Sequence, residues 1–169
     1  MRSFLIGGLL AVMAAFGLAT AADAGVLITI DKSTQRMAVS VDGVQKYVWP
    51  VSTGAKGYTT PSGSFTPFRM EAEHYSKEWD DAPMPNSVFF TPKGHAIHGS
   101  NATRRLGSPA SHGCVRLAPQ NAAALFALIQ KKGMYNTKIV IADRVPPAKF
   151  SKKKGGGQKL PGYYYLMHP

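Results

Sequence analysis

Apolar side chains recur along most of the chain at the short spacing that is typical of strands. Residues 26–30 form one apolar run, and apolar residues alternate with small ones over residues 37–41. Asp42 and Gly43 follow, and both tolerate the positive φ angles of a two-residue turn, so we expect a hairpin into a third strand over residues 44–52. The same spacing predicts further strands at residues 64–70, 87–91, 95–98 and 137–141.

One stretch, residues 118–132, has the spacing of an amphipathic helix. Pro119 suits the first turn, because its missing N–H costs nothing there, and Gly133 offers a C-terminal stop. The apolar positions on the predicted inner face are Ala122, Leu125, Phe126 and Ile129. The patterning therefore predicts a mainly β domain with one main α-helix.

Residues 71–86 interrupt this regularity. They are polar and aromatic, and Pro83 and Pro85 disfavour regular structure, so we expect a loop. Loops of this length often act as lids or binding surfaces, and Trp79 is placed to cap a substrate groove. The alternative is that Trp79 only packs the loop onto the sheet, and the pattern does not separate the two. We expect His74 to be a solvated loop residue.

The two ends of the chain differ from the middle. Residues 1–24 combine one basic residue, an apolar run and a small-x-small exit, which is the pattern of a secretory signal peptide. A membrane anchor is the alternative, but the apolar core is short. We therefore expect an exported protein of the periplasm or cell wall, with one domain over residues 25–143. Residues 144–169 hold six basic residues and no acidic one, and we expect a flexible, solvated tail.

The charge balance narrows the class of partner. The chain has 20 Lys and Arg residues against 9 Asp and Glu residues, a net charge of +11, and removing residues 1–24 takes away one charge of each sign. Such an excess favours an anionic partner, and outside the cytoplasm the candidates are cell-wall polymers and acidic lipid headgroups. No nucleic-acid-binding motif accompanies the charge, so we expect no nucleic-acid partner. We expect a monomer.

Cys114 is the single cysteine, and its neighbours suit a nucleophile. One cysteine cannot form an internal disulfide, so in an exported protein it is inert and buried, paired with another molecule, or reactive. A thiol at its ordinary pKa is only ~3% ionised at neutral pH, so a cysteine nucleophile benefits from a base, and His98 is the candidate. His98 would take the thiol proton and return it to a leaving amine, the two halves of acyl transfer at an amide.

Residues on either side of Cys114 have candidate roles in the same chemistry. Gly113 permits close approach of a substrate, and the N–H groups of Gly113 and Cys114 could stabilise an oxyanion. Arg116 lies on the same side of an extended segment as Cys114, where it could lower the thiol pKa or hold a substrate carboxylate. His112 is expected to shape the pocket or donate a structural hydrogen bond.

Three other interpretations compete with a reactive thiol. Cys114, His98, His112 and His95 are ligand types for zinc or copper, but their spacing matches no established ligand motif. On a strand His95 and His98 would also point to opposite faces, so only one of them could face Cys114. We expect no metal and no cofactor. An inert buried thiol conflicts with its polar neighbours, and a non-catalytic basic wall-binding module would not need the thiol and the histidine together.

The residues that carry the chemistry form a recognisable signature. His98-Gly99 is followed, after a variable connection, by Ser-His-Gly-Cys-Val-Arg at residues 111–116. This resembles the active-site signature of the L,D-transpeptidase catalytic domain family, and the likeness extends over about residues 26–143. It implies a β-sandwich-like catalytic fold with one main helix, Cys114 as nucleophile, and His98 as its base. The site residues that we expect beside this pair are Gly99, Gly113 and His112 as orienting or oxyanion groups, and Arg116, Ser111 and Trp79 at the substrate.

The resemblance also implies a substrate. Family members act on bacterial peptidoglycan, where the thiolate attacks the bond between the third residue of a tetrapeptide stem and its terminal D-Ala, and an amine then takes the acyl group. A second stem peptide as acceptor gives a 3→3 cross-link, whereas an amine of an outer-membrane protein anchors that protein to the wall. Water as acceptor gives carboxypeptidase or hydrolase activity. The sequence leaves the acceptor open.

Overall fold

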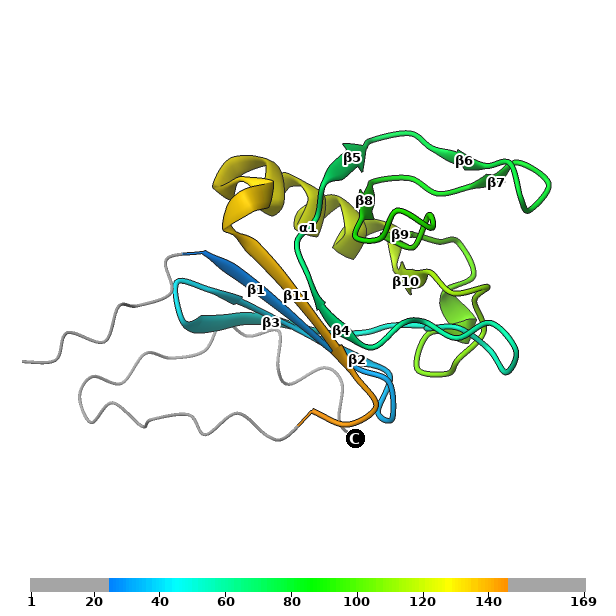
Figure 1. The fold of residues 1–169 in the computed structure, drawn as a ribbon, viewed down its shortest axis with the longest axis horizontal. Helices are drawn as coiled ribbons and strands as arrows, with labels where there is room; N and C mark the ends of the chain where they lie inside the picture. The colour runs from blue at the N-terminus through cyan, green and yellow to red at the C-terminus, as the bar shows by residue number, and fades with distance from the viewer. Residues whose placement is uncertain (1–24, 146–169) are drawn as a thin grey trace, which may run out of the picture.

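The computed structural model describes residues 25–145, and within them two sheets and one main helix enclose a common core (Figure 1). The larger sheet has five strands in the order β3-β2-β1-β11-β4. β1 pairs in parallel with β11, and all other pairs in this sheet are antiparallel. The strands are β1 Val26–Asp31, β2 Arg36–Val41, β3 Val44–Pro50, β4 Gly63–Phe65 and β11 Thr137–Ala142.

The hairpin between β2 and β3 confirms the turn prediction. Asp42 and Gly43 have φ angles of 51° and 76°, which are the positive values that a type I′ turn requires. Val41 pairs directly with Val44, so the turn consists of these two residues.

The smaller sheet has four strands in the order β10-β9-β8-β5. β10 and β9 are parallel, and the other two pairs are antiparallel. The strands are β5 Arg69–Glu71, β8 Ser87–Phe89, β9 Ala96–Gly99 and β10 Val115–Leu117. Between β5 and β8 the chain makes a further two-stranded hairpin, β6 Tyr75–Ser76 with β7 Ala82–Pro83, which projects from the end of the molecule away from the helix (Figure 1). We call residues 72–86 the lid segment.

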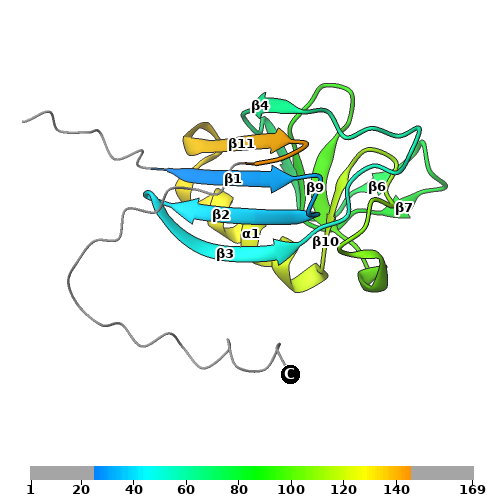
Figure 2. The same cartoon turned by 90° about the horizontal axis from the view of Figure 1, so that it is seen from below.

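The helix α1, Pro119–Lys132, forms where the apolar spacing predicts it. Ala118 occupies the N-cap position without a side-chain cap, and Gly133 ends the helix with a φ of 93°, which favours glycine. Ala122, Leu125 and Ile129 are buried, and the helix packs against β9 and β8. Seen from below, α1 lies behind the larger sheet (Figure 2). Two short 3-10 helices, η1 Thr103–Arg105 and η2 Met134–Asn136, complete the elements.

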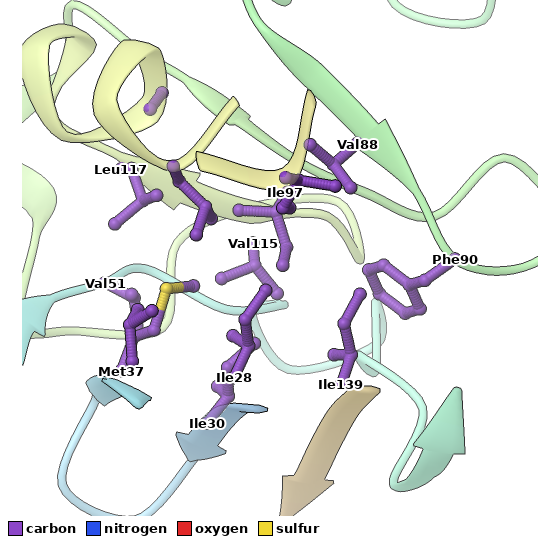
Figure 3. Close-up of a cluster of buried hydrophobic side chains, with 14 of the residues drawn as sticks. Ile28, Ile30, Met37, Val51, Val88, Phe90, Ile97, Val115, Leu117 and Ile139 are labelled. Carbon is purple, nitrogen blue, oxygen red and sulfur yellow. The ribbon is translucent and has the colours of Figure 1, made fainter. Parts of the chain in front are cut away.

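The main core lies between the larger sheet on one side and α1 with the smaller sheet on the other (Figure 3). Alternate residues of β1, β2 and β11 point into it, as the period of two requires. Ile28, Ile139 and Leu125 are at most 1% exposed, so each buries its whole side chain. At about 25 cal/mol per Å² of apolar area, burial of such a side chain contributes roughly 2 kcal/mol.

Three expectations about elements were wrong in detail. Residues 64–70 form two short strands in different sheets, β4 and β5, because Pro67 lies between them and cannot donate to a ladder. Residues 71–86 contain the β6–β7 pair, whose Pro83 sits on an isolated two-stranded edge. The strand expected over residues 95–98 begins one residue later, at Ala96.

The predicted signal peptide, residues 1–24, and all but the first two residues of the predicted tail lie outside the described residues. Within residues 25–145 no helix combines the length and the apolar character that a membrane crossing requires.

Candidate active site

Cys114 lies immediately before β10, on the face of the smaller sheet that points away from the main core. The parallel pairing of β10 with β9 sets Arg116 opposite His98, and the same register brings Cys114 beside Ala96. The thiol is free and half-buried, and it packs against a small apolar cluster of Met84, Phe89 and Ala96. Because side chains alternate along a strand, Ile97 and Val115 point into the main core. One face of this sheet thus carries core side chains, and the other carries the candidate functional side chains.

His98 is buried beside the nucleophile, with 6% of its surface exposed. Its Nδ1 lies 2.8 Å from the Gly99 carbonyl oxygen. Since a carbonyl only accepts, Nδ1 carries the hydrogen, and the lone pair is on Nε2. Gly99 therefore has the orienting contact that we expected of it.

The burial of both groups keeps them neutral at rest. Desolvation, with smaller contributions from Arg116 and His74, lowers the pKa of His98 to about 4 despite the raising effect of the Gly99 hydrogen bond. Burial raises the pKa of the Cys114 thiol above its ordinary value, partly offset by the Ala96 backbone and Arg116. The Cys114 Sγ also lies 3.8 Å from the Gly94 carbonyl oxygen, an acceptor that suits a protonated thiol. The resting pair is therefore a thiol beside a neutral imidazole.

The turn that precedes Cys114 is held by its own side chains. The Ser111 hydroxyl donates to the Cys114 carbonyl and accepts the Gly113 N–H at 3.2 Å. Thr60 donates its hydroxyl to the Gly113 carbonyl at 2.8 Å, which ties the turn to the segment after β3. The Gly113 φ of 112° is one that other residues rarely adopt. Ser111 is thus engaged by the backbone of the turn, and it is 1% exposed.

These bonds correct the oxyanion assignment. The Gly113 N–H is buried and already donates to Ser111, so it is not free to receive a developing charge. The backbone N–H of Cys114 is then the remaining donor of the two that the sequence suggested.

Arg116 lies on the same face as Cys114, as the extended spacing predicts. Its Nη1 donates to the Ala110 carbonyl at 3.1 Å, and its backbone pairs with Ser52 in both directions. The guanidinium is therefore held in place at the wall of the site, where its charge favours the thiolate form of Cys114.

His95 was predicted to face away from the nucleophile, and this is wrong. The position where a Gly113 Cβ would lie is 3.1 Å from the His95 ring, and both His95 and His98 line the cleft that holds Cys114. The alternation argument fails because His95 precedes β9 and belongs to the turn after β8. Its Nδ1 contacts the Thr91 hydroxyl at 2.8 Å.

The lid segment contacts the signature residues through aromatic rings. Trp79, between β6 and β7, stacks on His112 with ring centroids 3.7 Å apart and an angle of 7° between the planes. Tyr58 meets both rings edge-on, at 4.6 Å from His112 and 5.5 Å from Trp79. Trp79 therefore packs the lid segment onto His112, and both rings line the cleft. A role of either ring at the substrate stays a prediction.

The cleft has a volume of about 800 Å³ and is bounded by the lid segment, the turn after β8 and the signature residues. Within residues 25–145 no group of three or more potential metal-ligating side chains comes together. The sequence analysis missed Tyr58 and Met84, because their positions at the site depend on long-range folding. It also described His74 as solvated, whereas the side chain is only one-quarter exposed and its ring contacts Glu71. The short spacing between Glu71 and His74 was the available signal.

A free cysteine and a buried histidine held by the following carbonyl lie on one sheet face of a two-sheet fold with one main helix, which is the arrangement expected of the L,D-transpeptidase catalytic domain. The family model for the L,D-transpeptidase catalytic domain (YkuD) matches residues 25–141, and the chain belongs to this family. The fold, mainly β with one main helix, is that of solved L,D-transpeptidases.

Individual relatives agree with this classification. A Bacillus subtilis (strain 168) protein named as a candidate L,D-transpeptidase, YqjB, is 27% identical over 128 residues, which are 69% of this chain and 70% of that protein. The L,D-transpeptidase from Mycobacterium smegmatis superposes with a TM-score of 0.63 at 25% identity, over 70% of this chain and 58% of that one. L,D-transpeptidase 3 from Mycobacterium tuberculosis, solved with a faropenem-derived adduct, has the same fold at a TM-score of 0.57 and 23% identity, over 69% of this chain and 60% of that one. The chain thus spans less than two thirds of both solved enzymes.

Proposed function

We propose that this protein is a peptidoglycan L,D-transpeptidase that works through an acyl-enzyme on Cys114. The observation that carries the proposal is the placement of a free thiol and a buried, neutral His98 on one face of two paired strands, inside a cleft of about 800 Å³. Membership of the L,D-transpeptidase family supports the choice of a tetrapeptide stem as donor.

Acylation begins with Cys114 as a thiol. Sγ attacks the carbonyl carbon between the third residue of the stem and its terminal D-Ala, while its proton passes to Nε2 of His98. The Gly99 carbonyl, which accepts from Nδ1, stabilises the imidazolium that forms. The Cys114 N–H is the donor offered to the oxyanion, and the charge of Arg116 favours the developing thiolate. His98 then protonates the amine of D-Ala, the C–N bond breaks, and a thioester remains.

Deacylation transfers the stem to an acceptor. An amine of a second stem peptide gives a 3→3 cross-link, and an amine of an envelope protein, such as an outer-membrane protein, gives a covalent anchor. Water is the second candidate acceptor, because Cys114 is only half-buried and solvent can reach a thioester there. With water the same site is an L,D-carboxypeptidase.

The proposed setting follows from the sequence. The signal-peptide pattern of residues 1–24 supports export to the periplasm, where peptidoglycan lies, and the net charge of +11 suits an anionic polymer. We expect the exported protein to act as a monomer.

The deciding experiment incubates the protein with disaccharide tetrapeptide and follows D-Ala release and product masses. Cys114→Ser and Cys114→Ala are expected to abolish release while thermal unfolding stays within a few degrees of wild type, because the thiol is half-buried and contributes little packing. Dimers indicate transpeptidation, and tripeptide alone indicates hydrolysis. D-Ala release by the Cys114→Ala variant would rule out the mechanism.

A β-lactam provides a second readout of the same thiol. The Mycobacterium tuberculosis relative was solved with a faropenem-derived adduct, which supports the expectation that penems and carbapenems acylate Cys114 here. The expected result is a mass increase of one inhibitor-derived group, absent from Cys114→Ser. A chelator should leave acylation unchanged, whereas a thiol alkylator should prevent it.

A further inference from the structure

Three charged or titratable side chains where β5 meets the lid segment form a cluster that acylation does not use. The His74 Nδ1 lies 2.6 Å from Glu71 Oε2, and Arg69 Nη1 lies 3.3 Å from Glu71 Oε1. The carboxylate thus accepts a hydrogen bond from the ring on one oxygen and forms an ion pair with the guanidinium on the other. With Nδ1 donating to Glu71, the lone pair of the neutral ring is on Nε2.

The cluster shares the floor of the cleft with the nucleophile. Phe89 connects this cluster with the nucleophile, because it packs in the same apolar group as Cys114. The Arg69 guanidinium lies 3.7 Å above the centre of the Phe89 ring, and the His74 ring meets that ring edge-on, with the centroids 5.0 Å apart. His74 and Arg69 line the same cleft as Cys114 and His98. His74 is also close enough to His98 to be one of the groups that lower its pKa, after burial and Arg116.

Transfer to an amine has a proton requirement that transfer to water lacks. An aliphatic amine is an ammonium ion at neutral pH, without a lone pair, so one proton must leave before the nitrogen can attack the thioester. As the C–N bond forms and the C–S bond breaks, a second proton leaves the nitrogen. His98 takes the second proton and passes it to the departing Cys114 sulfur, which restores the thiol. The first proton needs another base.

We propose that His74, held and oriented by Glu71, is the catalytic base that removes the first proton from the acceptor ammonium. The proposal rests on the transpeptidase function proposed above. His74 Nε2 receives the proton, the Glu71 carboxylate stabilises the resulting imidazolium, and the proton then passes to solvent through the quarter of the ring that is exposed. Glu71 also places a negative charge beside the His74 ring, which lines the cleft. Arg69 cannot take a proton, and its contacts with Glu71 and Phe89 make it a positioning residue.

The test separates the two half-reactions and varies the charge of the acceptor. The protein is supplied with tetrapeptide donor, and the initial burst of D-Ala reports acylation. The acyl-enzyme then reacts, in separate samples, with a stem-peptide amine or with hydroxylamine. The stem-peptide amine is cationic at neutral pH, whereas hydroxylamine is mostly neutral there and needs no first deprotonation. His74→Gln and Glu71→Gln are the variants. Glu73→Gln is the matched control, since it makes the same chemical change at an exposed position outside the cleft.

The expected result is selective. Both variants keep the D-Ala burst and the reaction with hydroxylamine, and both lose roughly 10²-fold in the rate of transfer to the cationic amine. Glu73→Gln matches wild type in the D-Ala burst, in the reaction with hydroxylamine and in the rate of transfer to the cationic amine. An equal loss with both acceptors would overturn the proposal by showing a structural role, and so would an unchanged rate with the cationic amine. The burst itself reports that each variant is folded. Absence of a burst from wild type would instead overturn the transpeptidase function.

Discussion

Burial favours the neutral forms of both members of the proposed catalytic pair, the Cys114 thiol and the His98 imidazole, over a preformed ion pair. Burial raises the pKa of the thiol and lowers that of His98 to about 4, so both shifts oppose charge separation before substrate binds. From the sequence His98 was expected both to raise the thiolate fraction and to take the thiol proton for a leaving amine. Burial favours the neutral imidazole, which suits the second task, and our proposed mechanism therefore has His98 accept the proton as the sulfur attacks.

This distinction gives the first prediction. His98→Ala should lower the rate of D-Ala release by roughly 10²- to 10⁴-fold, because it removes the proton acceptor. The same variant should change the rate of Cys114 alkylation by iodoacetamide much less, since the resting thiolate fraction is set by burial. The measurement is alkylation against pH, and the wild-type rate should keep rising above the ordinary thiol range. A wild-type plateau near neutral pH that disappears in His98→Ala would show a preformed ion pair.

Gly113 carries a second prediction at this scale. Its φ of 112° is strained for any other residue, and an added Cβ would lie 3.1 Å from the His95 ring. Gly113→Ala should therefore lower the free energy of unfolding by about 1–3 kcal/mol and slow acylation. The double variant with His95→Ala removes the contact but keeps the strained angle, so urea denaturation of both should show partial recovery. Identical stability of the two would mean that only the angle matters.

The sequence predicts which residues belong to the candidate site better than it predicts where their side chains point. The place of Cys114 and His98 in one cleft, and the contact of His98 with Gly99, could be predicted because the signals for them lie in a few neighbouring residues. The side of the sheet on which His95 lies could not, because it depends on where β9 begins, and a shift of one residue changes the answer. The Gly113 N–H could be proposed as a donor, but its bond to Ser111 requires the folded turn.

At the scale of elements, the lid segment forms one wall of the cleft that holds Cys114. It rests on the signature residues through the stack of Trp79 on His112 and through the Met84 and Phe89 cluster beneath. The β6–β7 hairpin has two residue pairs, and backbone hydrogen bonds from Met84 to His74 and from Asn86 to Ala72 continue its pairing toward β5 and β8. At the tip of the hairpin, the aromatic contacts of Trp79 add to these hydrogen bonds.

Removal of the stack should loosen the lid segment without unfolding the domain. An aromatic pair contributes about 0.5–1.5 kcal/mol, so Trp79→Ala should raise KM for the tetrapeptide by about 3- to 10-fold, with a smaller effect on kcat. Limited proteolysis should cleave the variant faster within residues 76–82. Trp79→Phe keeps a ring on His112 and serves as the matched control. Equal proteolysis of the three proteins would show that the stack does not hold the segment.

Element boundaries follow local signals where the signals are strong. The Asp42-Gly43 turn and the Pro119 to Gly133 limits of α1 were predicted because turn and cap chemistry involves adjacent residues. The division of residues 64–70 between two sheets was missed, since the pattern is the same for one strand as for two short ones. Pro67 was the signal that separates them.

Across the whole molecule, the two faces of the smaller sheet differ in role, because one packs into the main core and the other carries the candidate catalytic residues. Ile97 and Val115 on one face belong to the main core, and His98 and Cys114 lie on the other. A buried imidazole on the second face nevertheless links catalysis to folding, because its proton affinity differs between the folded and unfolded chains.

The link predicts that the domain loses stability in mild acid. In the unfolded chain His98 binds its proton near pH 6.5, whereas in the folded protein its pKa is about 4, since burial penalises the cation. Between these values the unfolded chain holds more protons, so the free energy of unfolding falls as the pH falls. For His98 alone the loss between pH 7 and pH 5 is about 2 kcal/mol. Urea denaturation at several pH values measures it.

His98→Gln is the variant that isolates this contribution, because glutamine does not titrate. His95 adds to the wild-type slope with the same sign, since burial also lowers its pKa, so His95→Gln provides the matched comparison. The stability of His98→Gln should vary less between pH 7 and pH 5 than that of wild type or of His95→Gln. Parallel stability curves for wild type and His98→Gln would show that His98 titrates alike in both states, and the neutral resting pair at the active site would then be wrong as well.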